Sequence, residues 1–124
     1  MIGIIAAMDS EVRDIKSAME DGIKIHHGGM TFFKGKLHQK EVIAVKSGVG
    51  KVNAAMCTQI LIDIFKVSSL IHVGVAGAVH PDLEIGDIVI SEDSCQYDMD
   101  ARALAIPGAK YQTWTLLFLK PIRP

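Results

Sequence analysis

The chain has 124 residues, 49% of them hydrophobic, and a formal net charge of −1. This length suits one domain with a sizeable core, and the scattered Lys and Arg side chains do not suggest binding to nucleic acid or to an acidic membrane. No apolar stretch reaches the roughly 18 residues that a membrane span needs, and Asp9 and Glu11 interrupt the apolar N-terminus too early for a signal peptide. Cys57 and Cys95 stand far apart and without metal-ligand spacing, so we expect reduced thiols in a cytoplasmic protein.

The first two elements are predicted from the apolar pattern at the N-terminus. Residues 2–8 form an unbroken apolar run, which is typical of a strand covered on both faces. A helix is predicted over residues 10–20, with Asp9 or Ser10 as its cap. Its apolar side chains recur at helical spacing: Val12, Ile15 and Met19.

Short strands are predicted next, at residues 23–27, 31–37 and 41–46, with turns at the polar and glycine-rich steps between them. A second helix is predicted over residues 50–65. Its apolar side chains occupy one broad face, so we expect this helix to be mostly buried: Val52, Met56, Ile60 and Ile64, with Ala55, Cys57 and Leu61 beside them.

Two further strands are predicted at residues 70–73 and within 83–91. Strands that alternate with helices indicate an α/β fold, here a three-layer sandwich around a mixed, partly parallel sheet. After Asp100 the pattern weakens. Residues 111–119 are apolar enough for a strand, but Pro121 and Pro124 cannot continue a strand or a helix.

Glu11 is the first catalytic candidate. It follows the first predicted strand, and open α/β sheets bind ligands at the carboxyl ends of their strands. On the predicted helix it shares a face with Ile15 and Ala18, beside the buried stripe. The alternative is an ordinary carboxylate in the first turn, where the helix dipole favours negative charge.

Two glycine-containing segments are candidate binding loops. In residues 46–55, Gly48 and Gly50 make a turn from strand to helix that could receive an anion or a polar ligand edge. The sequence does not match a nucleotide-triphosphate P-loop, and the alternative is a turn that needs glycine for backbone reasons. In residues 73–78, small side chains allow either close approach of a ligand or close packing of helix on sheet.

The five histidines form no recognisable set of metal ligands. His26 and His27 are adjacent and would point to opposite faces of a strand. His72, in an apolar strand, is more often a satisfied core residue than a ligand. We therefore predict no metal site.

Taken together, four segments resemble the N-terminal half of a 5′-methylthioadenosine/S-adenosylhomocysteine nucleosidase, in the purine nucleoside phosphorylase superfamily. These segments occur in order at residues 2–12, 46–55, 74–78 and 83–91. The resemblance extends from Met1 to about Asp100. It implies a nucleoside phosphorylase-like fold, with residues 1–104 as the N-terminal portion of a nucleosidase domain.

The resemblance also implies an activity and a site. The family hydrolyses the N-glycosidic bond of 5′-thio-substituted adenosines and releases adenine, without metal or organic cofactor. By resemblance, Glu11 orients and activates the attacking water. The other matching residues are implied to line the ribose, the water and the base: Met8, Val49, Val75, Ala76 and Gly77. The full-length protein is implied to be a homodimer.

Part of the family's machinery has no match in this sequence. An Asp that protonates the purine N7 and a Glu that grips the ribose hydroxyls belong to the C-terminal half. From about Ala105 the sequence departs from the family's pattern, which leaves residues 105–124 as a divergent tail. We therefore expect a truncated or frameshifted product, with a natural short paralogue as the alternative, and little turnover by the chain alone.

Two other functions remain as rivals. A nucleoside phosphorylase is disfavoured by Glu11, because a phosphate nucleophile needs basic groups and N–H donors at that place. A non-catalytic binding or interaction domain built on the same half-fold is favoured by the unmatched second carboxylate.

Overall fold

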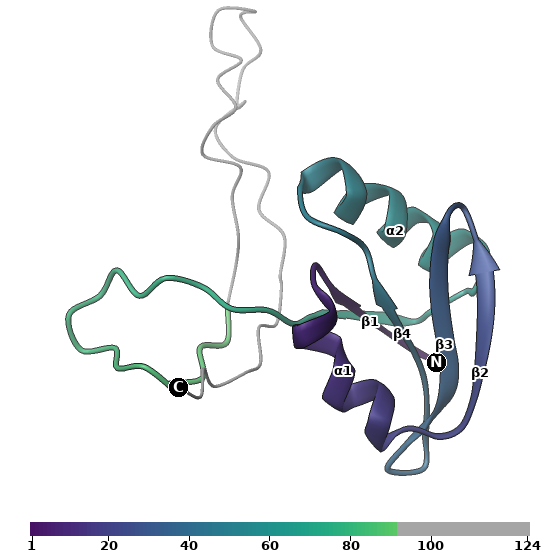
Figure 1. Cartoon of the computed structure of the whole chain (residues 1–124), viewed down its shortest axis with the longest axis horizontal. Helices are drawn as coiled ribbons and strands as arrows, with labels where there is room; N and C mark the ends of the chain where they lie inside the picture. The colour runs from purple at the N-terminus through teal and green to yellow at the C-terminus, as the bar shows by residue number, and fades with distance from the viewer. Residues whose placement is uncertain (92–124) are drawn as a thin grey trace, which may run out of the picture.

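The computed structural model describes residues 1–91, which form a five-stranded mixed sheet with strand order β2-β3-β4-β1-β5 (Figure 1). Strand β1 is parallel to both of its neighbours, β4 and β5. The remaining two strands add antiparallel ladders on the β4 side. The strands are β1 (Ile2–Ala6), β2 (Glu20–His27), β3 (Met30–Leu37), β4 (Lys40–Lys46) and β5 (Ser69–His72). The predicted mixed, partly parallel sheet is confirmed.

Strands β1 and β4, which pair with each other inside the sheet, carry the least polar sequence. In β1 the residues from Gly3 to Ala6 are all buried, and in β4 Val42 to Val45 are buried. Side chains on such strands alternate between the two faces, so both faces must be covered. The unbroken apolar run that suggested a doubly covered first strand therefore has the expected position in the sheet.

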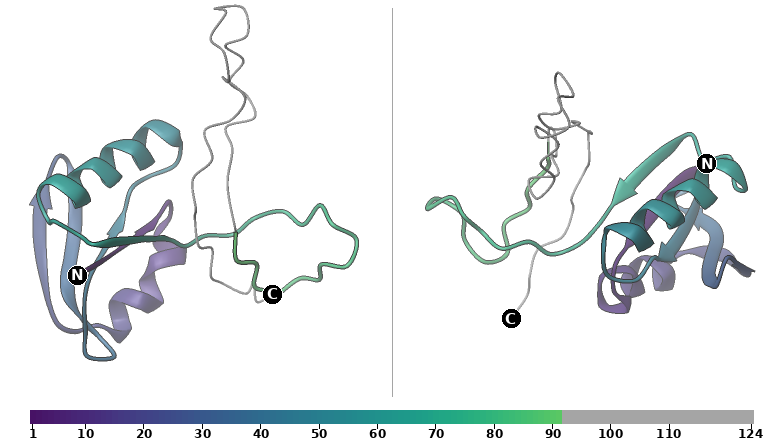
Figure 2. Two further views of the ribbon diagram at one scale, coloured as in Figure 1. Left: turned by 180° about the vertical axis from the view of Figure 1, so that it is seen from behind. Right: turned by 90° about the horizontal axis from the view of Figure 1, so that it is seen from above.

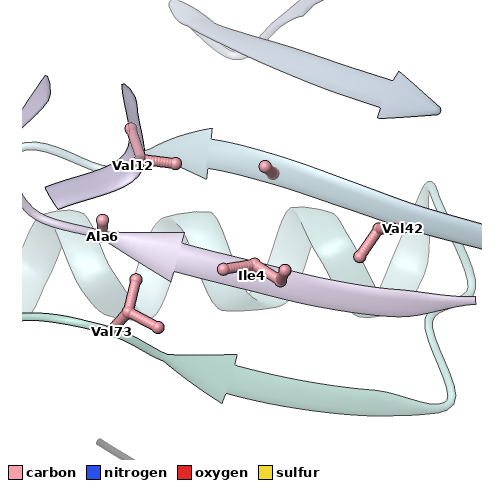
Figure 3. Close-up of a cluster of buried hydrophobic side chains, with 6 residues drawn as sticks. Ile4, Ala6, Val12, Val42 and Val73 are labelled. Carbon is pink, nitrogen blue, oxygen red and sulfur yellow. The ribbon is translucent and has the colours of Figure 1, made fainter. Parts of the chain in front are cut away.

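One helix covers each face of the sheet, which gives the predicted three layers (Figure 2). Helix α1 (Asp9–Ala18) packs through Val12 on β1 and β4, where Ile4, Ala6 and Val42 meet it (Figure 3). Helix α2 (Lys51–Asp63) packs on the opposite face through Cys57 and Leu61. The predicted apolar face of the first helix is confirmed, since Ile15 and Met19 also pack against the cluster around Val12.

The prediction that the second helix is mostly buried is wrong. Cys57 and Leu61 are buried, but Val52, Met56 and Ile64 are 74%, 48% and 53% exposed. The sheet can cover only one side of a helix, and the predicted face was too broad for that contact. Ile60 packs against the cluster around Cys57 and Leu61, whereas Val52, Met56 and Ile62 of α2 are exposed.

The strand predicted within residues 83–91 is also absent from the structure. After β5 the chain from 73 to 91 leaves the sheet as a wide loop (Figure 1). It contains a turn in which Asp87 N donates to Glu84 O at 3.2 Å and Glu84 N donates to Asp87 Oδ2 at 2.8 Å. An apolar sequence becomes a strand only when its backbone pairs with a neighbouring strand, and among the described residues this segment has none.

Several predictions lie outside the described residues: Cys95, the strand-like run at 111–119 and the divergent tail at 105–124. In the described part of the chain, neither helix is long and apolar enough to cross a bilayer.

Candidate functional site

The candidate site lies where the carboxyl ends of β1, β4 and β5 meet. Ala6 pairs with Lys46 on one side of β1, and Ile5 pairs with His72 on the other. The ladders continue past the strands, because Ser47 N donates to Ala6 O at 2.8 Å and Val73 N donates to Ile5 O at 2.9 Å. The three loops that carry the predicted site residues therefore start side by side.

This edge is also a switch point in the topology. The chain leaves β1 into α1 on one face of the sheet and leaves the neighbouring β4 into α2 on the other face. Loops that diverge in this way open a crevice between them, which is where doubly wound sheets bind ligands. The location predicted from the order of strands and loops is thus the location that the topology favours.

Glu11 lies in the first turn of α1 with only 6% of its surface exposed. Its Oε2 accepts a hydrogen bond from Met8 N at 2.9 Å, and its Oε1 accepts one from Val75 N at 3.2 Å. The carboxylate thus joins the start of α1 to the loop that follows β5. Its position agrees with the interpretation of Glu11 as an ordinary carboxylate in the first turn of a helix. The side chain is, however, buried and hydrogen-bonded to a residue 64 positions away in the sequence.

The expected cap of this helix is different in the structure. Met8 is the N-cap residue, with extended backbone angles, and Glu11 rather than Asp9 or Ser10 accepts the free N–H at the helix start. Asp9 instead points to Lys46, whose Nζ donates to its Oδ2 at 2.6 Å. The predicted cap is wrong because the helix begins earlier than expected: Asp9 and Ser10 already lie inside it, and Met8 is the residue in front.

The other predicted site residues lie on the three loops that follow β1, β4 and β5, and all of them are exposed. The structure brings Met8 and Val75 to Glu11 through their backbone amides, and their side chains are 40% and 52% exposed. Val49 is 73% exposed, on the loop after β4. Ala76 and Gly77 are exposed, and neither hydrogen bond of the Glu11 carboxylate reaches them or Val49. A surface hollow of about 240 Å³ lies elsewhere, between α1 and β3.

The loop between β4 and α2 needs its glycines for backbone reasons. Gly48 and Gly50 have φ angles of 88° and 104°, in the left-handed region that favours glycine. Ser47 is buried, and its hydroxyl donates to the carbonyl of Gly48 at 2.9 Å. Asn53 Nδ2 donates to Val49 O at 2.8 Å and holds the loop on the helix. These contacts agree with the alternative interpretation of this motif as a strand-to-helix turn.

Burial and neighbouring charges shift the pKa values of three groups near the site. Burial lowers the pKa of His72, while the negative charge of Glu11 acts in the opposite direction. The hydrogen bond from Lys46 lowers the pKa of Asp9. Burial also lowers the pKa of Lys16, whose ammonium lies 4.2 Å from the centre of the Phe33 ring.

Two residues near Glu11 were not proposed as site residues from the sequence. His72 was interpreted as a core residue, yet its ring lies within the electrostatic reach of Glu11. Gly74 was grouped with the other small residues, although it faces the Glu11 carboxylate directly. The sequence signal for both was their position at the end of a strand. Among residues 1–91, no group of three or more His, Cys, Asp or Glu side chains is placed to hold a metal ion.

Comparison with known proteins gives one family. The model of the phosphorylase superfamily matches residues 1–115. A curated relative from Oceanobacillus iheyensis, a 5′-methylthioadenosine/S-adenosylhomocysteine nucleosidase, is 47% identical over 102 residues, which is 82% of this chain and 44% of the relative.

Solved structures give the same result. The nucleosidase of this type from Colwellia psychrerythraea, in complex with adenine, superposes with a TM-score of 0.85 at 37% identity, over 92% of this chain and 49% of its own. The S-adenosylhomocysteine nucleosidase from Streptococcus pyogenes, in complex with 5-methylthiotubericidin, has a TM-score of 0.85 at 35% identity, over 92% and 50% of the two chains. The chain therefore spans about half the length of the relatives it matches.

Proposed function

The chain belongs to the phosphorylase superfamily, and from this membership we propose that it supplies the N-terminal half of the active site of a nucleosidase. The proposed reaction is hydrolysis of the N-glycosidic bond of 5′-methylthioadenosine and S-adenosylhomocysteine, with release of adenine. The names of the relatives support this substrate class, and one related structure holds adenine, the proposed product.

The observation that carries the proposal is the buried carboxylate of Glu11 at the carboxyl ends of β1 and β5. Each carboxylate oxygen accepts one backbone N–H bond, from Met8 and from Val75. A carboxylate oxygen has a further lone pair, so Glu11 can also accept a proton from a water that attacks the anomeric carbon. A base held in place by two backbone groups and a helix turn has the fixed position that such proton transfer requires.

The residues around Glu11 are proposed to contact the substrate. Met8 and Val49 offer exposed apolar side chains that are proposed to line the ribose and the water site. Residues 75–77 are proposed to lie beside the ribose and the base, where the small side chains of Ala76 and Gly77 leave the backbone accessible. As the family resemblance implies, the proposed reaction needs no metal or organic cofactor.

Three finer assignments belong to this proposal. We propose that the full-length form is a homodimer, acts in the cytoplasm and serves methionine salvage. The outward-facing apolar side chains of α2 support an assembly, because such patches are commonly covered in interfaces.

A chimeric enzyme tests the proposed function. In it, the 102 aligned residues of this chain replace the matching segment of the Oceanobacillus iheyensis nucleosidase, which then supplies the C-terminal half. We expect adenine release from 5′-methylthioadenosine and from S-adenosylhomocysteine, at a rate independent of added phosphate. Release that requires phosphate would instead indicate a phosphorylase.

The 124-residue chain alone forms the second arm of the experiment, and we expect it to release little or no adenine. Departure of adenine needs a proton on the base, and general acid catalysis contributes about 10²–10⁴-fold. A folded chimera that binds the nucleoside without hydrolysing it would favour the non-catalytic binding domain.

A further inference from the structure

Gly74 lies at the point where the loop after β5 meets the Glu11 carboxylate. The residue before it, Val73, is buried and donates to Ile5 O at 2.9 Å, which extends the pairing with β1. The residue after it, Val75, donates to Glu11 Oε1 at 3.2 Å. Gly74 is therefore held from both sides, with little freedom to move away from the carboxylate.

The space beside Gly74 explains why this position has no side chain. A Cβ built on Gly74 would lie 3.2 Å from Glu11 Oε1 and 3.7 Å from the carboxyl carbon. Gly74 is not among the glycines with positive φ, so its backbone conformation is open to other residues. The nearby carboxylate, rather than the backbone, accounts for glycine at this position.

We propose that Gly74 is a positioning residue: its missing Cβ lets the Glu11 carboxylate reach the Val75 amide, and so fixes the base at the end of β5. The inference rests on the proposed function for its catalytic meaning, but the geometry on which it depends can be measured without substrate. It also gives a reason for glycine at position 74. From the sequence alone, the small residues of this segment were explained by close approach of a ligand or by packing of helix on sheet.

The two hydrogen bonds of Glu11 should respond differently to a methyl group at position 74. The bond from Val75 is 3.2 Å long, at the outer end of the usual range for N–H···O bonds. A displacement of Oε1 by a few tenths of an ångström therefore breaks it. The bond from Met8 is 2.9 Å long and goes to the other oxygen, Oε2, which the methyl group does not approach.

The test compares ¹H–¹⁵N NMR spectra of the ¹⁵N-labelled chain and its variants at one fixed pH. In the parent chain, the amide protons of Met8 and Val75 should both lie downfield of their positions in Glu11→Ala, because each donates to the Glu11 carboxylate. In Gly74→Ala the Met8 amide should keep its downfield position. The Val75 amide of Gly74→Ala should instead match the Val75 amide of Glu11→Ala/Gly74→Ala, which has no carboxylate to bind.

Gly22→Ala is the matched control, since a Cβ there would meet nothing within 4 Å and Gly22 has no positive φ. Both amides should keep their parent positions in this variant. The proposal is overturned if the Val75 amide of Gly74→Ala still lies downfield of that in Glu11→Ala/Gly74→Ala, or if the Val75 amide has the same position in the parent chain and in Glu11→Ala. Failure of the chimera to release adenine, with these amide positions as expected, would overturn the proposed function alone.

A double substitution covers the case in which Gly74→Ala does not fold. With Glu11→Ala in the same chain, the added methyl group has no carboxylate to meet, so Glu11→Ala/Gly74→Ala should fold as well as Glu11→Ala alone. If Gly74→Ala lowers the Tm equally with and without the Glu11 side chain, or if both variants fail to fold while Glu11→Ala folds, the methyl group clashes elsewhere and the proposal is wrong.

Discussion

At the scale of single residues, Glu11 combines burial with charge. A carboxylate removed from water is unfavourable unless hydrogen-bond donors replace the water, and the backbone amides of Met8 and Val75 are such donors. The same arrangement that makes the carboxylate tolerable in the fold makes it rigid at the candidate site. The same two hydrogen bonds therefore position the Glu11 carboxylate and stabilise it within the fold.

Removal of the Glu11 side chain should lower the free energy of unfolding. In Glu11→Ala two backbone N–H groups lose their partner near the core, and one unsatisfied buried group costs about 1–3 kcal/mol. Glu20→Ala is the control, because Glu20 is exposed, and its effect should stay within about 0.5 kcal/mol. Urea unfolding followed by circular dichroism measures both. Equal losses in the two variants would mean that the Glu11 hydrogen bonds contribute nothing to stability.

Cys57 should be unreactive in the folded chain. Burial between α2 and the sheet raises the pKa of its thiol from 9.0 to about 11, and only the thiolate reacts with alkylating agents. Iodoacetamide at about pH 8 should therefore modify Cys57 only after unfolding in urea, as peptide mass spectrometry can establish. Rapid modification of Cys57 in the native chain would contradict the burial of α2 on this side.

The raised pKa of Cys57 also gives a pH dependence of stability. The unfolded thiol loses its proton near pH 9.0 and the folded thiol only near 11. Between these values the unfolded chain binds fewer protons than the folded chain, so stability falls as the pH rises. The midpoint of urea unfolding, measured across this interval, should fall more steeply in the parent chain than in Cys57→Ala.

At the scale of elements, the two sides of α2 should differ sharply. Leu61 is fully buried against the sheet, whereas its neighbour Ile62 is 43% exposed. Leu61→Ala removes packed methyl groups and should cost about 2–5 kcal/mol. Ile62→Ala should change the stability by about 0.5 kcal/mol or less. Similar losses in the urea midpoints of the two variants would show that α2 does not pack on the sheet as described.

The elements also show which parts of the fold the sequence predicts. The buried runs of β1 and β4 and the amphipathic pattern of α1 are local signals, and the structure agrees with them. The exposure of one face of α2 and the loop conformation of residues 83–91 do not follow from the local sequence. Val52 and Ile88 are apolar in sequence, but whether an apolar residue is buried depends on which other element covers it.

The candidate site shows the same difference between local sequence signals and long-range contacts. Glu11 and the loops at the strand ends were identified because strand order places them on one edge of the sheet. The hydrogen bond from Val75 to Glu11 joins residues 64 positions apart, and the role of Gly74 depends on it. No pattern within either segment contains that contact, so only the three-dimensional arrangement separates Gly74 from the other small residues.

At the scale of the whole molecule, the 124-residue chain should associate at higher concentration. Val52 and Met56 are exposed on one side of α2, and further apolar residues are exposed in the loop after β5. The formal net charge of −1 offers little electrostatic repulsion. Sedimentation velocity should show concentration-dependent species, reduced in Val52→Gln/Met56→Gln. A monodisperse monomer with a sharp, cooperative melt would contradict this expectation.

The central claim is that Glu11 of this chain acts as the base of a nucleosidase, and Glu11→Gln in the chimeric enzyme tests it most directly. The amide nearly matches the carboxylate in size but cannot accept the proton of the attacking water, so adenine release from 5′-methylthioadenosine should fall by about 10²–10⁴-fold. The thermal melt should remain cooperative, and Asp9→Asn, which alters an exposed carboxylate on the same helix, should keep the activity. Adenine release by Glu11→Gln at a rate close to that of the unsubstituted chimera would contradict the claim.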